Sequence, residues 1–237
     1  MSQPPWRSVA QGSPLLTGLE PSVQEEILKQ AVFRKLRRGQ VLFRQGEPAA
    51  ALYVVAAGRL KLVQEDSFGH QVVVRFVNPP QVVAAVAVTP GHRYPVTAVA
   101  VEEGGVVLWP AESLRELCRR FPALSLNATA QIAAHMEDMQ QRFLELASER
   151  VEQRLARCLT RLARQVGRQV PEGILLDVPL SRQDLASMTG TTLYTVSRIL
   201  SHWEGQGIVK AGRQKLVILR PHALVAVAED LPEGGKP

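Results

Sequence analysis

The 237-residue chain has little of what marks several specialised classes of protein. Its two cysteines, Cys118 and Cys158, exclude a disulfide framework and cannot supply the four thiolates of an iron–sulfur cluster within one chain. The longest apolar run, Ala49 to Ala57, has nine residues and is too short to cross a bilayer. The N-terminus lacks the basic-then-apolar order of a signal peptide. We therefore expect a soluble cytoplasmic protein.

Acidic residues are outnumbered by basic ones, mainly in the C-terminal part. The net charge is +6 and the isoelectric point is near 9.7. From Glu149 onward there are 13 Lys and Arg against 9 Asp and Glu, and before it 15 against 13. This distribution is compatible with nucleic acid as a partner but does not identify it. No nucleophile–base pair and no metal-ligand cluster stands out, so we do not expect an enzyme.

Short apolar runs between recurring glycines occupy residues 32 to 110. Ser22 is expected to cap a helix just before them. Five runs have the composition of strands: Val41–Phe43, Ala51–Val55, Arg59–Val63, Gln71–Val77 and Thr97–Val101. Their turn-marked spacing predicts a small antiparallel sandwich or barrel.

From Pro122 onward the apolar residues follow a helical period. Five of them are spaced four and three apart, as in a heptad seam: Ile132, Met136, Met139, Phe143 and Leu146. The seam could pack on the preceding β domain or on the same seam of a second chain. Roughly 25 residues without an internal proline or glycine make about 37 Å of helix, longer than a small barrel covers. We therefore expect these five residues to form a homodimer interface.

A second amphipathic helix is expected from Glu149 to Val166. Cys158 falls on its apolar face, and Cys118 lies in another amphipathic run, Glu112 to Arg120. Both cysteines are expected to be structural rather than reactive.

The segment after residue 180 has the spacing of a helix-turn-helix. Ser181 and Asp184 form a candidate capping box, Gly190 can adopt the left-handed turn, and Thr192 can cap a second helix. Leu185, Ala186, Val196 and Ile199 would face inward. Two further runs, Ile208–Lys210 and Lys215–Leu219, are predicted to pair as a wing.

The outward face of the predicted second helix favours DNA binding over a helical hairpin that merely packs. It carries polar, hydrogen-bonding residues: Thr192, Tyr194, Thr195, Ser197, Arg198 and Ser201. No Asp or Glu follows in this helix before Glu204. A helix that enters the major groove needs donors for base edges and no carboxylates near phosphates.

Nearly the whole chain resembles the cyclic-AMP receptor protein/FNR (Crp/Fnr) family of bacterial transcription regulators. Three stretches carry the resemblance: Gly39–Ala49, Leu52–Leu62, and Ser181–Ala186 with Thr195–Leu200. It implies an α+β protein with a cyclic-nucleotide-binding-like β-roll (residues 1–120), a dimerisation helix (121–148) and a winged helix (149–237). It also implies a homodimer that binds a palindromic operator and acts on RNA polymerase.

The resemblance implies DNA contacts position by position. Arg198 matches the family's base-reading arginine, and Ser197 the serine beside it. Tyr194, preceded by Leu193, stands in place of the family's base-reading glutamate, so the operator is expected to differ at that base pair; Leu193 could meet a thymine methyl. The expected phosphate contacts are Arg182, Gln183, Thr192, Thr195, Ser201 and Arg213.

The matching effector cassette departs from that of cyclic-AMP-responsive members. Ala84-Ala85 replaces the Gly-Glu pair that holds the ribose, and Arg93 alone remains near the phosphate position. We therefore do not expect cyclic AMP to bind. The candidate effector pocket comprises Val83, Ala84, Ala85, Arg93, Tyr94 and Thr97.

Three other modes of control stay open. The stretch from Tyr94 is similar to regulators that respond to nitric oxide, some through haem, for which the candidate ligands are His70, His92 and His135. A regulator without an effector, its pocket filled by side chains, is the second mode. A ligand-binding module that acts on a protein partner is the third, since the β-roll also serves kinases and channels.

Overall fold

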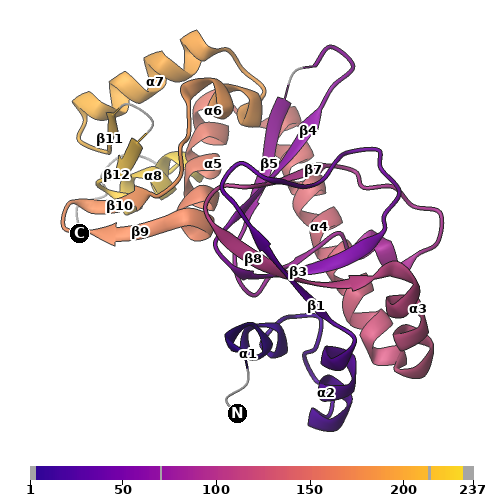
Figure 1. Ribbon diagram of the computed structural model, residues 1–237. Helices are drawn as coiled ribbons and strands as arrows, with labels where there is room; N and C mark the ends of the chain where they lie inside the picture. The colour runs from indigo at the N-terminus through magenta and orange to yellow at the C-terminus, as the bar shows by residue number, and fades with distance from the viewer. Residues whose placement is uncertain (1–3, 70, 213–214, 232–237) are drawn as a thin grey trace. The chain divides into compact units, whose positions relative to one another are not determined.

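The computed structural model describes residues 4–69, 71–212 and 215–231. The chain divides into two compact units, Met1–Met139 and Gln140–Pro237. Figure 1 shows strands gathered in the first and mainly helices in the second.

The first unit is a roll of two four-stranded sheets. One sheet has the strand order β1-β8-β3-β6 and the other β2-β7-β4-β5, and all pairs are antiparallel. The strands are β1 (Val32–Leu36), β2 (Val41–Phe43), β3 (Ala51–Ala57), β4 (Leu60–Glu65), β5 (Gln71–Val77), β6 (Val82–Val83), β7 (Thr97–Ala100) and β8 (Gly104–Pro110). The helical elements are α1 (Pro5–Gln11), α2 (Pro21–Lys29), the 3₁₀ turn η1 (Ala85–Val88), α3 (Ala111–Arg120) and the start of α4 (Pro122–Ser148).

Strand β3 shows why this unit has two cores. Successive side chains of a strand point to opposite faces, and both faces of β3 are buried. Leu52 and Val54 join the core under α1, α2 and α3, whereas Tyr53 and Val55 join the core between the sheets. The apolar run of β3 therefore follows from burial on both faces.

The second unit combines helices with a four-stranded sheet of order β11-β12-β10-β9. Its elements are α5 (Val151–Val166), β9 (Gly167–Val170), β10 (Gly173–Leu176), α6 (Arg182–Thr189), α7 (Leu193–Gly205), β11 (Val209–Gly212), β12 (Lys215–Ile218) and α8 (Pro221–Ala228). The predicted wing is the pair β11–β12, in which Gly212 lies opposite Lys215.

The observed architecture confirms the α+β class, the antiparallel roll and the helix-turn-helix with its wing. Three strands of the roll (β1, β6 and β8), the hairpin β9–β10 and helix α8 were not individually predicted. The expected cap at Ser22 is wrong. Helix α2 begins at Pro21, its N-cap residue is Glu20, and no side chain caps it. Proline at the first helical position provides the start instead, because its fixed φ suits a helix and its missing N–H needs no partner.

Candidate nucleic-acid interface

Helix α6 begins at a reciprocal cap. The Ser181 hydroxyl accepts a hydrogen bond from the Asp184 N–H at 3.0 Å. The Asp184 carboxylate in turn accepts from the Ser181 N–H at 2.8 Å and from its hydroxyl at 2.6 Å. These bonds satisfy N–H groups that a helix start leaves without partners. The predicted capping box is therefore present, and it places Arg182 and Gln183 in the first turn.

The turn between α6 and α7 favours glycine because of its backbone conformation. Gly190 adopts φ 61° and ψ 46°, the left-handed conformation that closes α6. A Cβ atom here would lie 2.8 Å from Cδ2 of Leu146, the end of a flexible side chain that can shift. The next helix, α7, begins at Leu193 and is capped by Thr192, whose hydroxyl accepts a hydrogen bond from the Thr195 N–H at 3.2 Å.

The two faces of the helix pair differ sharply in burial. The four residues predicted to face inward are at most 7% exposed: Leu185, Ala186, Val196 and Ile199. The small side chain of Ala186, fully buried, lets the two helices cross closely. Burial of these residues fixes which side of α7 is presented to solvent.

The solvent face of α7 is polar and carries no carboxylate. Tyr194, Arg198 and Ser201 are exposed, and Ser197 is half-buried beside them. The first acidic residue of the helix, Glu204, is directed to the wing, where its carboxylate accepts the Ala211 N–H at 2.8 Å. The face can therefore approach a polyanion without repulsion from a nearby negative charge.

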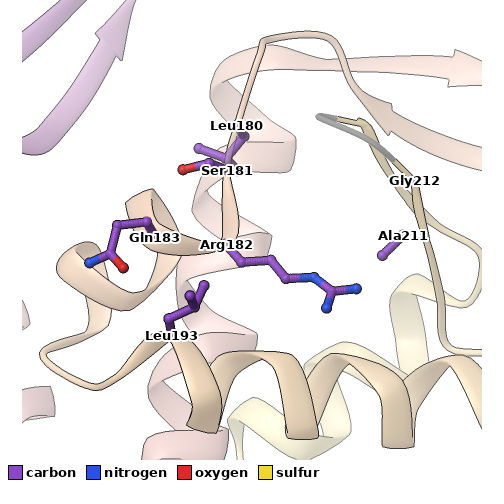
Figure 2. Close-up of a pocket in the computed structure, with 7 residues that line it drawn as sticks. All are labelled: Leu180, Ser181, Arg182, Gln183, Leu193, Ala211 and Gly212. Atoms are coloured by element: carbon purple, nitrogen blue, oxygen red, sulfur yellow. The ribbon is translucent and has the colours of Figure 1, made fainter.

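A hollow of about 590 Å³ lies between the starts of α6 and α7 and the wing. Its lining residues are Leu180, Ser181, Arg182, Gln183, Leu193, Ala211 and Gly212. Figure 2 shows the side chain of Arg182 extending from α6 toward Ala211 and Gly212. A cationic group thus lies in a concavity that opens beside the exposed face of α7.

The structure brings most of the predicted DNA contacts onto this one surface. Two predicted phosphate contacts, Arg182 and Gln183, line the hollow. The others in the described residues lie on α7 or just before it: Thr192, Thr195 and Ser201. The Thr192 and Thr195 hydroxyls also lie 2.9 Å apart, within hydrogen-bonding distance of each other. Arg213 lies outside the described residues.

The sequence did not predict a role for Arg154, whose guanidinium donates to backbone carbonyls of the turn between α6 and α7. Its Nε donates to the Thr189 carbonyl at 3.0 Å, its Nη1 to the Glu149 carbonyl at 2.7 Å, and its Nη2 to the Gly190 carbonyl at 3.5 Å. One guanidinium therefore connects the segment before α5 to the turn before α7. An arginine close to the apolar stripe of α5 was the available signal.

Arg154→Ala is expected to lower the free energy of unfolding by about 1.5–3 kcal/mol, the scale for hydrogen bonds from a charged donor. Arg154→Lys should recover part of this loss, because one ammonium cannot reach all three carbonyls. Urea titrations followed by circular dichroism measure both effects. Arg164→Ala, an exposed arginine on the same helix, is the matched control. If the Arg154→Ala and Arg164→Ala proteins were equally stable, the hydrogen bonds of Arg154 would not stabilise the turn.

The residues of the candidate effector pocket lie in different surroundings. Val83 and Tyr94 are buried in the core between the sheets, whereas Ala85 belongs to the core under the helices. Arg93 is exposed and donates to the Gly46 carbonyl at 2.6 Å. Thr97 accepts the Gln45 N–H at 3.0 Å. Ala84 adopts a left-handed φ of 61° at the start of η1.

Aromatic side chains fill the roll where Tyr94 lies. The ring of Tyr94 stacks on Phe43 with centroids 4.0 Å apart, and Phe43 stacks on Tyr53 at 5.5 Å. The Tyr94 hydroxyl accepts the Ala51 N–H at 3.0 Å and donates to the Ala51 carbonyl at 3.1 Å. Burial, together with its contact to Tyr94, raises the pKa of the Tyr53 phenol. This part of the roll is a packed, hydrogen-bonded interior.

The predicted dimer residues form a largely exposed apolar stripe on α4. Met136, Met139, Phe143 and Leu146 are 58%, 54%, 70% and 49% exposed. Ile132 differs, because it packs in part against the core of its own unit. Apolar side chains of this size rarely stay in water along one helix face without a partner.

The candidate haem ligands and the cysteines occupy unrelated places. His92 is exposed and lies 3.2 Å from the Pro90 carbonyl, His135 is half-buried on α4, and His70 falls outside the described residues. Cys158 is buried, which raises the pKa of its thiol to about 11, and burial also raises the pKa of the Cys118 thiol. Within the described ranges, no group of three or more His, Cys, Asp or Glu could hold a metal ion.

Two family models match the chain. Residues 33–121 match the cyclic nucleotide-binding domain, and residues 153–227 match the Crp-like helix-turn-helix domain. In the described part of the chain, no helix is both long and apolar enough to span a membrane.

Named relatives match over most of their length. The chain is 28% identical over 210 residues to the transcriptional activator protein Anr of Pseudomonas aeruginosa, covering 89% of this chain and 85% of the relative. It is 28% identical over 201 residues to the cyclic AMP receptor protein of Thermus thermophilus, covering 85% and 90%. Among solved structures, the regulator CLP of Xanthomonas campestris aligns with a TM-score of 0.72 at 20% identity, over 84% of this chain and 99% of the other, which supports the fold alone.

Proposed function

Because the chain belongs to the Crp/Fnr family of transcription regulators and carries its helix-turn-helix DNA-binding domain, we propose that it acts as a cytoplasmic homodimer on a roughly palindromic operator. In this proposal each chain lays α7 into the major groove, and the bound dimer changes transcription by RNA polymerase. The observation that carries it is the exposed, carboxylate-free face of α7 with Arg198 at its centre.

The side chains on and beside that face suit two roles: some can recognise bases and others can contact phosphates. Arg198 matches guanine, whose O6 and N7 accept two hydrogen bonds from one guanidinium. Ser197 can donate or accept beside it. Arg182 and Gln183 in the hollow suit phosphates, which fix register without reading sequence. The short polar side chains of Thr192 and Ser201 suit the same role on the flanks.

The apolar stripe of α4 supports the dimer. Four of its side chains are about half exposed or more, and pairing two such stripes removes them from water. Fully burying one side chain of this kind contributes about 1.5–3 kcal/mol gross. About half of each side chain remains to be buried, so the eight side chains of two chains contribute about 6–12 kcal/mol, above the lower estimates for the cost of association, about 4–15 kcal/mol.

We further propose that the regulator does not depend on cyclic AMP. A buried cyclic phosphate needs a cationic partner, and the Arg93 guanidinium instead donates to a surface carbonyl. Ala84 and Ala85 offer no carboxylate to a ribose. The stacked rings of Phe43 and Tyr94 support an interior that is already filled.

The proposal is tested by titrating the protein with random duplex DNA at several salt concentrations. We expect log K to fall linearly with log salt, with a slope of about −0.9 for each phosphate neutralised. Adding cyclic AMP should leave the curve unchanged. A flat dependence on salt would contradict DNA binding and favour a module that acts on a protein partner.

A further inference from the structure

The first turn of α7 exposes an aliphatic side chain and an aromatic ring beside the polar groups of this face. Tyr194 is 77% exposed and Leu193 is 47% exposed. They stand where the helix would first meet base edges, because the N-terminal residues of a recognition helix make those contacts. Exposed apolar surface is stabilised when an apolar group of a partner covers it. The exposure of these two side chains therefore suits an apolar group on the surface that α7 binds.

Helical spacing places both side chains next to the base-reading positions. Residues three and four apart are neighbours on a helix surface. Tyr194 therefore adjoins Ser197 and Arg198, and Leu193 adjoins Ser197. Figure 2 shows Leu193 at the start of α7, beside the hollow that Arg182 enters. Tyr194 thus continues the row of Arg198 along the exposed face, and Leu193 borders the hollow.

The major groove offers one apolar group on a natural base edge. This is the C5 methyl of thymine, and 5-methylcytosine presents the same group at the same place. A carboxylate at this turn would accept a hydrogen bond from the cytosine amino group. An aliphatic chain cannot do so, and the phenol has its single oxygen at the far end of the ring. The chemistry of the turn therefore suits a methylated pyrimidine.

We propose that Leu193 and Tyr194 form a subsite for the C5 methyl of a pyrimidine in each half-site, adjacent to the guanine that Arg198 grips. Thymine fills the subsite in ordinary DNA, and 5-methylcytosine fills it better than cytosine. The inference rests on the proposed DNA-binding function. It adds to that function a preference for a base with a C5 methyl in each half-site of the operator.

The expected effect follows from the area of one methyl group. Burying one methyl raises affinity about fourfold. A symmetric operator holds two half-sites, so removing both methyls weakens binding about 15-fold when the two effects add.

The experiment begins with selection of duplexes from a random pool by the wild-type protein. Deoxyuridine, which lacks only the methyl, then replaces thymine at symmetric pairs of positions, and Kd is measured by fluorescence anisotropy at constant salt. We expect one pair at which the wild type loses about 15-fold and Tyr194→Ala loses less than twofold. At that pair, 5-methylcytosine should bind the wild type more tightly than cytosine.

Three variants separate the methyl contact from other roles of the ring. Tyr194→Phe should keep the preference for thymine over deoxyuridine, since it keeps the ring and loses only the hydroxyl. Tyr194→Glu should lose that preference and favour unmethylated cytosine. Val225→Ala, an exposed apolar residue on α8, should change nothing. Tyr194 is so exposed that circular dichroism should show all its variants folded.

The outcomes of these experiments distinguish failure of the methyl subsite from failure of the proposed DNA binding. Selected duplexes whose binding is insensitive to every deoxyuridine would overturn the subsite and leave DNA binding intact. So would equal losses for Tyr194→Phe and Tyr194→Ala on all duplexes, which would assign the hydroxyl to a phosphate. A pool that yields no enriched duplex would overturn the proposed function and the subsite with it.

Discussion

Met139→Lys is expected to convert the homodimer into monomers. Met139 lies in the middle of the exposed stripe on α4 and is 54% exposed in the single chain. In the proposed dimer it meets the same stripe of the partner, so the substitution places two ammonium groups in one apolar seam. Desolvating an unpaired ion costs several kcal/mol. The dimer Kd should therefore rise at least about 100-fold, as sedimentation velocity would show.

Loss of the dimer should also weaken operator binding. A second half-site engaged by a linked chain strengthens binding by about 10²–10⁴, and a monomer forfeits that gain. Gln141→Lys is the matched control, because Gln141 lies on the same helix, is exposed and is polar already. A Met139→Lys protein that sediments as an unchanged dimer would remove the stripe from the interface.

Arg198→Ala is expected to cost about 1–3 kcal/mol at one base pair of each half-site, the value of a two-hydrogen-bond contact to guanine. The exposed guanidinium lies on the solvent face of α7, so the substitution should leave the core of the unit intact. Preference at that base pair should relax, because alanine cannot distinguish its alternatives. Competition among operators that differ at this pair measures the effect.

Arg182→Ala provides the contrast for this prediction. As a phosphate contact in the hollow, it should weaken binding about equally on every sequence and reduce the salt slope by about 1. If Arg198→Ala instead behaves in this way, Arg198 contacts phosphate and the guanine assignment is wrong.

The helix-turn-helix was predictable from the sequence because local chemistry specifies it. Ser181 with Asp184, Gly190, and Thr192 each act within a few residues, and each adopts the expected conformation. The periods of burial along α6 and α7 likewise follow from spacing alone. The exposed face that carries the candidate DNA contacts is therefore a local property of the chain.

Other parts of the fold depend on distant partners and escaped prediction. Strand β6 has only two residues, too few for a strand's usual signal. Strand β8 opens on Gly104 and Gly105, and its run Val106–Trp109 does have that signal, but the sequence does not show which strands it pairs with. In β8 those glycines are needed for space: a Cβ at Gly104 would lie 2.2 Å from the Ala57 carbonyl oxygen. The bond between Arg154 and the Thr189 carbonyl spans 35 positions, and only the folded chain reveals it.

The contacts of Tyr94 inside the roll exceed what the sequence could predict. Tyr94 is 3% exposed, and its hydroxyl is bonded to both polar groups of the Ala51 backbone. Which aromatic rings meet inside a roll is decided by strand register, and that register is set by pairings between segments far apart in the chain.

The indole of Trp203 is held in the second unit, 1% exposed, and its Nε1 donates to the Glu152 carboxylate at 3.0 Å. The two other tryptophans of the chain, Trp6 and Trp109, belong to the first unit. In a protein in which these two are replaced by phenylalanine, tryptophan fluorescence would arise from Trp203 alone. The winged-helix unit therefore contains its own optical probe, on the buried side of the helix whose opposite face is turned to solvent.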